Sequence, residues 1–119
     1  MGKMLIVDDE MEIRDLMAQN FAMEGIEVDT ASIAEEAISK IRGKKYDFML
    51  VDLVMPGKLN GLDIIQRVRK ISPNIYIVAI SGFCGNEITE KVIRAGANDF
   101  IMKPFEHQEL TKLFFTNRH

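Results

Sequence analysis

The chain has 119 residues, which fits one compact domain, and its 15 Lys and Arg against 18 Asp and Glu give a net charge of −3. The acidic balance argues against a general affinity for nucleic acid or acidic membranes, and no apolar run approaches the ~20 residues of a membrane span. One cysteine excludes an internal disulfide, so we expect a single domain over residues 1–119, located in the cytoplasm.

Short apolar runs alternate with amphipathic stretches along the whole chain. Apolar runs rich in β-branched residues predict strands, and apolar residues at helical spacing predict helices. In chain order we predict a strand at 4–7, a helix at 11–24, a strand at 26–31, a helix from 32 to about 42, a strand at 48–51, a helix at 62–71, a strand at 76–80, a helix at 87–95, a strand at 100–102 and a helix from 106 to about 117.

Two of these helices carry more specific predictions. In the first, Leu16, Met17 and Phe21 share one face and are expected to point inward. In the second, Ser32 is expected to be the N-cap, with Glu35 completing a capping box.

Strict alternation of strands and helices predicts a parallel sheet with helices on both faces. Right-handed crossovers leave few topologies, and the best candidate is the doubly wound α/β fold, a flavodoxin-like three-layer sandwich with five strands in the order 2-1-3-4-5. Such folds bind ligands beyond the carboxyl ends of the strands, so the residues that follow each strand are the candidates for a functional site.

Reactive residue types follow four of the five predicted strands. Asp8 and Asp9 follow the first strand, Asp52 the third, Ser81 the fourth and Lys103 the fifth. Taken singly, each has an ordinary explanation as a helix cap, a turn residue or a surface lysine. Taken together, they predict one pocket, because these four strands are neighbours in the predicted sheet.

The chemistry of the predicted pocket follows from its charges. Three carboxylates a few ångströms apart repel one another and need a cation, and oxygen ligands favour Mg²⁺, with Mn²⁺ as an alternative. A carboxylate is a nucleophile for phosphoryl transfer, and a metal, an ammonium and a hydroxyl are the groups that stabilise its transition state.

With these residues in view, the chain resembles the receiver domains of response regulators over its whole length. The motifs that carry the resemblance are Ile-Val-Asp-Asp-Glu at 6–10, Leu-Val-Asp at 50–52 with Met-Pro at 55–56, Ser-Gly at 81–82, and Gly-Ala-Asn-Asp-Phe at 96–100 running into Lys-Pro-Phe at 103–105. No one motif suffices, but the set is highly specific.

The resemblance implies a role for each residue of the pocket. Asp52 is the phosphoacceptor; Asp8, Asp9, Asp52 and the backbone carbonyl of Val54 bind Mg²⁺; and Lys103 pairs with the phosphoryl group. The resemblance further implies a switch pair formed by Ser81 and Phe100, and a cis peptide bond between Lys103 and Pro104.

The resemblance also implies partners. The phosphodonor would be a phosphohistidine on a sensor kinase or a phosphotransfer protein, and the output would pass to a downstream protein or a fused domain through a surface made by the fourth helix, the fifth strand and the fifth helix. The chain would catalyse its own phosphorylation and autodephosphorylation without turning over a conventional substrate. It could be a stand-alone receiver or part of a longer regulator.

One departure and two alternatives bear on this interpretation. Gly61 lies five residues after Pro56, where the family usually has four, so the loop carries one extra residue. A phosphatase of the haloacid dehalogenase type also uses a nucleophilic Asp, but it needs a second acid where this chain has Val54. A flavodoxin would have to hold phosphate beside Asp8 and Asp9, which would repel it.

Met11 and Ile13 lie early in the first predicted helix. They could be core residues or part of a kinase-docking surface.

Overall fold

The computed structural model describes residues 2–54, 60–82 and 85–115. Its strands are β1 (Lys3–Val7), β2 (Glu27–Ala31), β3 (Phe48–Asp52), β4 (Tyr76–Ser81) and β5 (Asp99–Met102), and its helices are α1 (Met11–Met23), α2 (Ala34–Gly43), α3 (Gly61–Ile71), α4 (Asn86–Ala95) and α5 (His107–Phe115). The predicted order of elements is confirmed.

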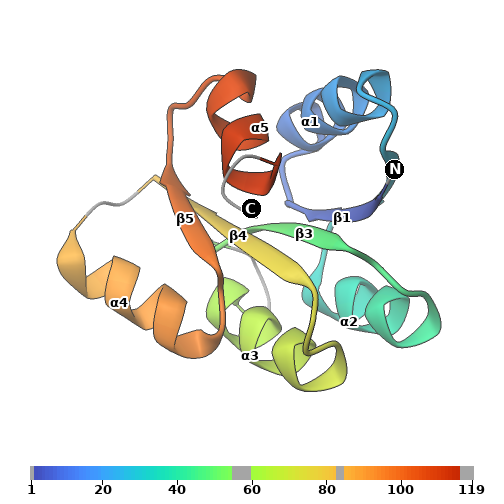
Figure 1. Cartoon of the computed structure of the whole chain (residues 1–119). Coiled ribbons are helices and arrows are strands. Elements are labelled where there is room, and N and C mark those ends of the chain that lie inside the picture. The colour runs from blue at the N-terminus through green and yellow to red at the C-terminus, as the bar shows by residue number, and fades with distance from the viewer. Residues whose placement is uncertain (1, 55–59, 83–84, 116–119) are drawn as a thin grey trace.

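The five strands form one parallel sheet in the order β2-β1-β3-β4-β5, as predicted (Figure 1). The register pairs Val7 with Val51, Asp52 with Ile80, and Ser81 with Met102. The carboxyl ends of β1, β3, β4 and β5 therefore lie side by side at one edge of the sheet.

Helices cover both faces of the sheet, α1 and α5 on one face and α2, α3 and α4 on the other (Figure 1). Two hydrophobic clusters fill the spaces between the layers. One contains Phe21 and Phe114 from the α1–α5 face, and the other contains Ile64, Ile65 and Val92 from the opposite face. The sheet can be apolar on both sides because both sides are covered, which explains why the strands read as continuous apolar runs.

The start of α3 packs directly on the end of β3. Asn60 caps the helix by accepting a hydrogen bond from the backbone N–H of Asp63, whose side chain accepts one from the backbone N–H of Asn60 in return. A Cβ atom on Gly61 would lie 2.5 Å from Leu53 Cα and 2.6 Å from the carbonyl oxygen of Asp52. Only glycine permits this close approach, which holds the backbone around Asp52 against the helix.

Two local predictions are wrong. Leu16 is 59% exposed, whereas Met17 and Phe21 are buried as expected. The capping box at the start of α2 does not form: the N-cap is Ile33, and the backbone N–H of Ser32 instead donates to the carboxylate of Glu36. The side chain of Glu36, four residues on, reaches that N–H, and the N-cap lies one residue later than the capping box would place it.

None of the helices within the described ranges is long and apolar enough to cross a membrane.

Candidate functional site

The predicted pocket lies at the carboxyl edge of the sheet. Asp8 directly follows β1, Asp52 and Ser81 are the last residues of β3 and β4, and Lys103 directly follows β5. Asp8, Asp52 and Ser81 are the buried polar residues of the described chain, although polar residues are rarely buried so completely. The sheet topology gathers them as the sequence predicted.

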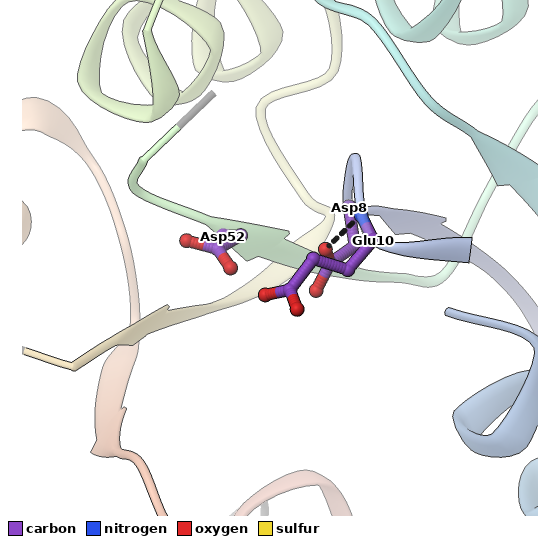
Figure 2. A group of neighbouring side chains, drawn as sticks. All are labelled: Asp8, Glu10 and Asp52. Carbon is purple, nitrogen blue, oxygen red and sulfur yellow. Dashed lines mark hydrogen bonds between the residues drawn. The ribbon is translucent and has the colours of Figure 1, made fainter. Parts of the chain in front are cut away.

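Three carboxylates come together at this edge, those of Asp8, Glu10 and Asp52 (Figure 2). One ligand oxygen from each lies within 4.8 Å of the others. Asp8 and Glu10 come from the segment after β1 and Asp52 from the end of β3, as Figure 2 shows. Asp9, which the sequence also offered as a ligand, is exposed and does not belong to this group.

The Asp8 carboxylate is only half satisfied by hydrogen bonds. Its Oδ1 accepts a hydrogen bond of 2.9 Å from the backbone N–H of Glu10. Its Oδ2 is buried and has no hydrogen-bond partner among the described residues. A buried oxygen without a partner lowers the stability of the folded state unless a ligand binds to it.

The pKa of Asp8 is raised to about 6, mainly by burial; the hydrogen bond from the backbone N–H of Glu10 opposes the rise, and repulsion from the Asp52 carboxylate adds to it. Asp8 is therefore largely ionised at pH 7, but at a cost to the folded state. A cation at the free oxygen would remove that cost.

Both oxygens of Asp52 are held in place. The backbone N–H of Val54 donates to Oδ1 at 2.9 Å, and the Lys103 ammonium donates to Oδ2 at 2.7 Å. The same ammonium lies 3.5 Å from Oε1 of Glu10. Although burial lowers the pKa of Lys103, its hydrogen bond to Asp52 and the charges of the neighbouring carboxylates hold that pKa above its usual value.

The remaining predicted residues lie at the end of β4, on β5 and directly after β5. Ser81 is fully buried, and its carbonyl oxygen accepts a hydrogen bond of 2.8 Å from the backbone N–H of Lys103. Phe100 is partly buried and packs against the cluster under α3 and α4. The peptide bond between Lys103 and Pro104 is cis, as predicted. The longer loop after Val54 falls at residues 55–59, outside the described residues.

The donor set fits a divalent cation. All the candidate ligands are oxygens, two of the three carboxylates are buried, and one buried oxygen has no partner in the described chain. Hard cations such as Mg²⁺ prefer ligands of this kind. The sequence motif already contained Glu10, but a run of three acids does not reveal which of them turn toward the sheet.

The family model of the response regulator receiver domain matches residues 4–115. The chain therefore belongs to this family, and it is a receiver domain of two-component signalling. Membership in this family argues against both alternatives raised by the sequence, a phosphatase of the haloacid dehalogenase type and a flavodoxin.

Individual relatives agree with this assignment. The chain is 38% identical over 108 residues to the chemotaxis protein CheY of Thermotoga maritima, covering 89% of each protein. It is 35% identical over 111 residues to the CpxR homolog of Haemophilus influenzae, a transcriptional regulatory protein, covering 92% of this chain and 47% of that one. The chain thus spans about half the length of that longer regulator.

A solved structure confirms the fold. A response regulator protein from Burkholderia pseudomallei superposes with a TM-score of 0.91 at 23% identity, over 98% of this chain and 68% of that one.

Proposed function

We propose that this receiver domain accepts a phosphoryl group on Asp52, from a phosphohistidine and with the help of Mg²⁺. The observation that carries the proposal is the pairing of Asp52 with two different neighbours: Lys103, which donates to one of its oxygens, and Asp8, whose buried Oδ2 has no partner in the described chain. The first neighbour can neutralise a phosphoryl oxygen, and the second can hold a cation beside it.

Asp8 and Asp52 are the carboxylates best placed to hold the metal, and the Val54 carbonyl stays a predicted ligand. Asp9 also stays a prediction, whereas Glu10 is supported as a near neighbour by the acidic group. Mg²⁺ keeps several waters, so it can bind two carboxylates and still accept a phosphoryl oxygen, and Mn²⁺ suits the same ligands. When bound, the metal would neutralise charge that develops on the phosphoryl oxygens.

In the proposed step, a carboxylate oxygen of Asp52 attacks phosphorus as the bond from phosphorus to the histidine nitrogen breaks. The imidazole keeps the electron pair of that bond, and a new bond joins phosphorus to Asp52. Lys103 and the Ser81 hydroxyl would bind the equatorial oxygens, where negative charge accumulates. Attack by water would return the free carboxylate and inorganic phosphate, so the domain would catalyse its own phosphorylation and dephosphorylation.

The switch would follow from the new charge. A phosphoryl group adds roughly −1.5 to −2 charge, and it offers strong acceptor oxygens. Ser81 would move toward those oxygens, Phe100 would turn inward into the space released, and the surface of α4, β5 and α5 would change. Phe100 is partly buried against the core, so an inward turn would bury more of its ring.

The donor is proposed to dock beside α1. Met11 and Leu16 are 62% and 59% exposed, so Met11 is not the core residue that it could have been. An apolar groove runs from Lys103 and Phe105 toward Leu16. Lys103, whose ammonium pairs with Asp52, is one of the residues that line this groove, so the groove suits the apolar face of a histidine-bearing helix, as in a sensor kinase or a phosphotransfer protein. A donor of this kind would act in the cytoplasm, which is the location we propose for the domain.

The output would be a downstream protein or a fused domain, without direct binding to nucleic acid or membrane by this domain. The similarity to both a chemotaxis protein of matching length and a longer transcriptional regulator supports either arrangement.

Labelling with acetyl phosphate tests the proposal. We expect Mg²⁺-dependent incorporation of one phosphoryl group in the parent and none in Asp52→Asn. The matched control is Asp47→Asn, which changes an aspartate at the opposite edge of the sheet and should label like the parent. Persistent Mg²⁺-dependent labelling of Asp52→Asn would remove Asp52 as the acceptor.

A further inference from the structure

Glu10 is a member of the acidic group that the proposed reaction does not use. Its side chain is exposed, its ligand oxygen lies within 4.8 Å of those of Asp8 and Asp52, and its Oε1 lies 3.5 Å from the Lys103 ammonium. We propose that Glu10 is a positioning residue whose charge acts on both ligands of the site. It raises the affinity of the site for the cation and lowers the affinity of the site for the phosphoryl group. This inference rests on the proposed function.

The backbone keeps Glu10 at the site. Its N–H donates to Asp8 Oδ1 at 2.9 Å, and its carbonyl accepts the hydrogen bond from Arg14 at 2.9 Å in the first turn of α1. The exposed side chain is therefore anchored at its base. Its charge stays near the metal ligands even when its carboxylate moves.

Lys103 has two carboxylate partners of different kinds. The contact with the buried Asp52 is 2.7 Å, and the contact with the exposed Glu10 is 3.5 Å. When a phosphoryl group arrives on Asp52, the ammonium must turn to the new oxygens. Glu10 then competes for the ammonium and faces a second anion.

The charge of Glu10 affects the two ligands in opposite directions. Glu10 adds one negative charge to a site that also holds Asp8, Asp52 and the Lys103 ammonium. This charge attracts a divalent cation and repels an anion that joins Asp52. With Glu10 made neutral, the site is one charge more positive, so it binds the cation more weakly and the anion more tightly.

The experiment measures these two affinities separately in the full chain. Mg²⁺ is titrated by calorimetry, and beryllofluoride, a phosphoryl mimic, is titrated at saturating Mg²⁺. In Glu10→Gln we expect Mg²⁺ affinity to fall and beryllofluoride affinity to rise, each roughly three- to ten-fold, for a charge a few ångströms away and partly screened by water. Glu10→Asp keeps the charge and should stay close to the parent.

The matched control is Glu12→Gln, which removes an exposed acid from the first turn of the same helix but lies outside the acidic group. It should change each affinity less than two-fold. Loss of structure would weaken both ligands together, so opposite shifts point to Glu10 itself. If Glu10→Gln matches the parent, or moves both affinities in the same direction, the role assigned to Glu10 is wrong. A parent that binds no beryllofluoride at all would instead overturn the proposed function.

Discussion

Two clusters of charge lie at opposite edges of the sheet, and they differ in how completely they are satisfied. At the amino ends of β4 and β5, the Arg69 guanidinium donates five hydrogen bonds of 2.7–2.9 Å, to the carbonyl oxygens of Pro73, Ile75 and Gly96 and to the side chain of Asn98. At the carboxyl ends, Asp8 leaves a buried oxygen without a partner in the described chain. Arg69, whose hydrogen bonds are made within the protein, holds structural elements together. Asp8, whose Oδ2 has no partner in the described chain, can bind a ligand.

The largest expected effect comes from breaking the satisfied cluster. Arg69→Ala should lower the free energy of unfolding by about 3 kcal/mol, because several carbonyl groups lose their donor at once. Urea denaturation measures this loss. Arg69→Lys should recover little of it, since an ammonium cannot reproduce the planar fork of donors.

The matched control for this prediction is Arg67→Ala, an exposed arginine two residues earlier on the same helix. It should cost less than about 0.5 kcal/mol, as surface substitutions usually do. Equal losses for the two arginines would show that the hydrogen bonds of Arg69 do not stabilise the fold.

The unsatisfied cluster should respond in the opposite sense. Asp8→Asn removes a buried charge whose Oδ2 has no hydrogen-bond partner in the described chain, so it should stabilise the metal-free protein at pH 7.5 by about 2 kcal/mol. It should also abolish the stabilisation that Mg²⁺ gives to the parent. Thermal unfolding with and without Mg²⁺ measures both effects, and a destabilised metal-free Asp8→Asn would contradict them.

The pH dependence sharpens the same contrast. The pKa of Asp8 rises from 3.8 to about 6 in the folded chain, so the folded state holds a proton that the unfolded state has already released. The contribution of Asp8 to stability therefore falls as the pH rises between these two values. Without metal, the advantage of Asp8→Asn over the parent should grow from pH 4 to pH 6.5. An advantage that is constant over this range would show that Asp8 has an ordinary pKa.

The smallest effects are expected in the NMR spectra of the protein bound to beryllofluoride, the phosphoryl mimic. Beryllofluoride should shift the amide signals of residues 82–95 and of Phe100 in the parent. Because Arg69 holds Gly96 and Asn98, we expect larger shifts at the first turn of α4 than at its carboxyl end. Unchanged signals at the start of α4 and at Phe100 would refute the switch.

Patterns of apolar residues predicted the fold well, and the fold in turn gathered Asp8, Asp52, Ser81 and Lys103. Each of these residues stands at a strand end, where topology alone fixes its position. Leu16 was misplaced because helical spacing defines a face only approximately, and the width of that face depends on what packs against it.

Other features have no sequence signal. The hydrogen bonds of Arg69 join α3 to loops that precede β4 and β5, and only the finished fold brings these together. Likewise, the chain leaves the strand after Val7, so strand alternation no longer shows whether Asp9 or Glu10 turns toward Asp52.

A crystal structure of the parent with Mg²⁺ and beryllofluoride tests the central claim most directly. The account predicts the anion on Asp52, within hydrogen-bond distance of the Lys103 ammonium and the Ser81 hydroxyl, and a metal ion bound by Asp8 and Asp52. An anion bonded to another residue, or a metal ion that Asp8 does not coordinate, would contradict this account.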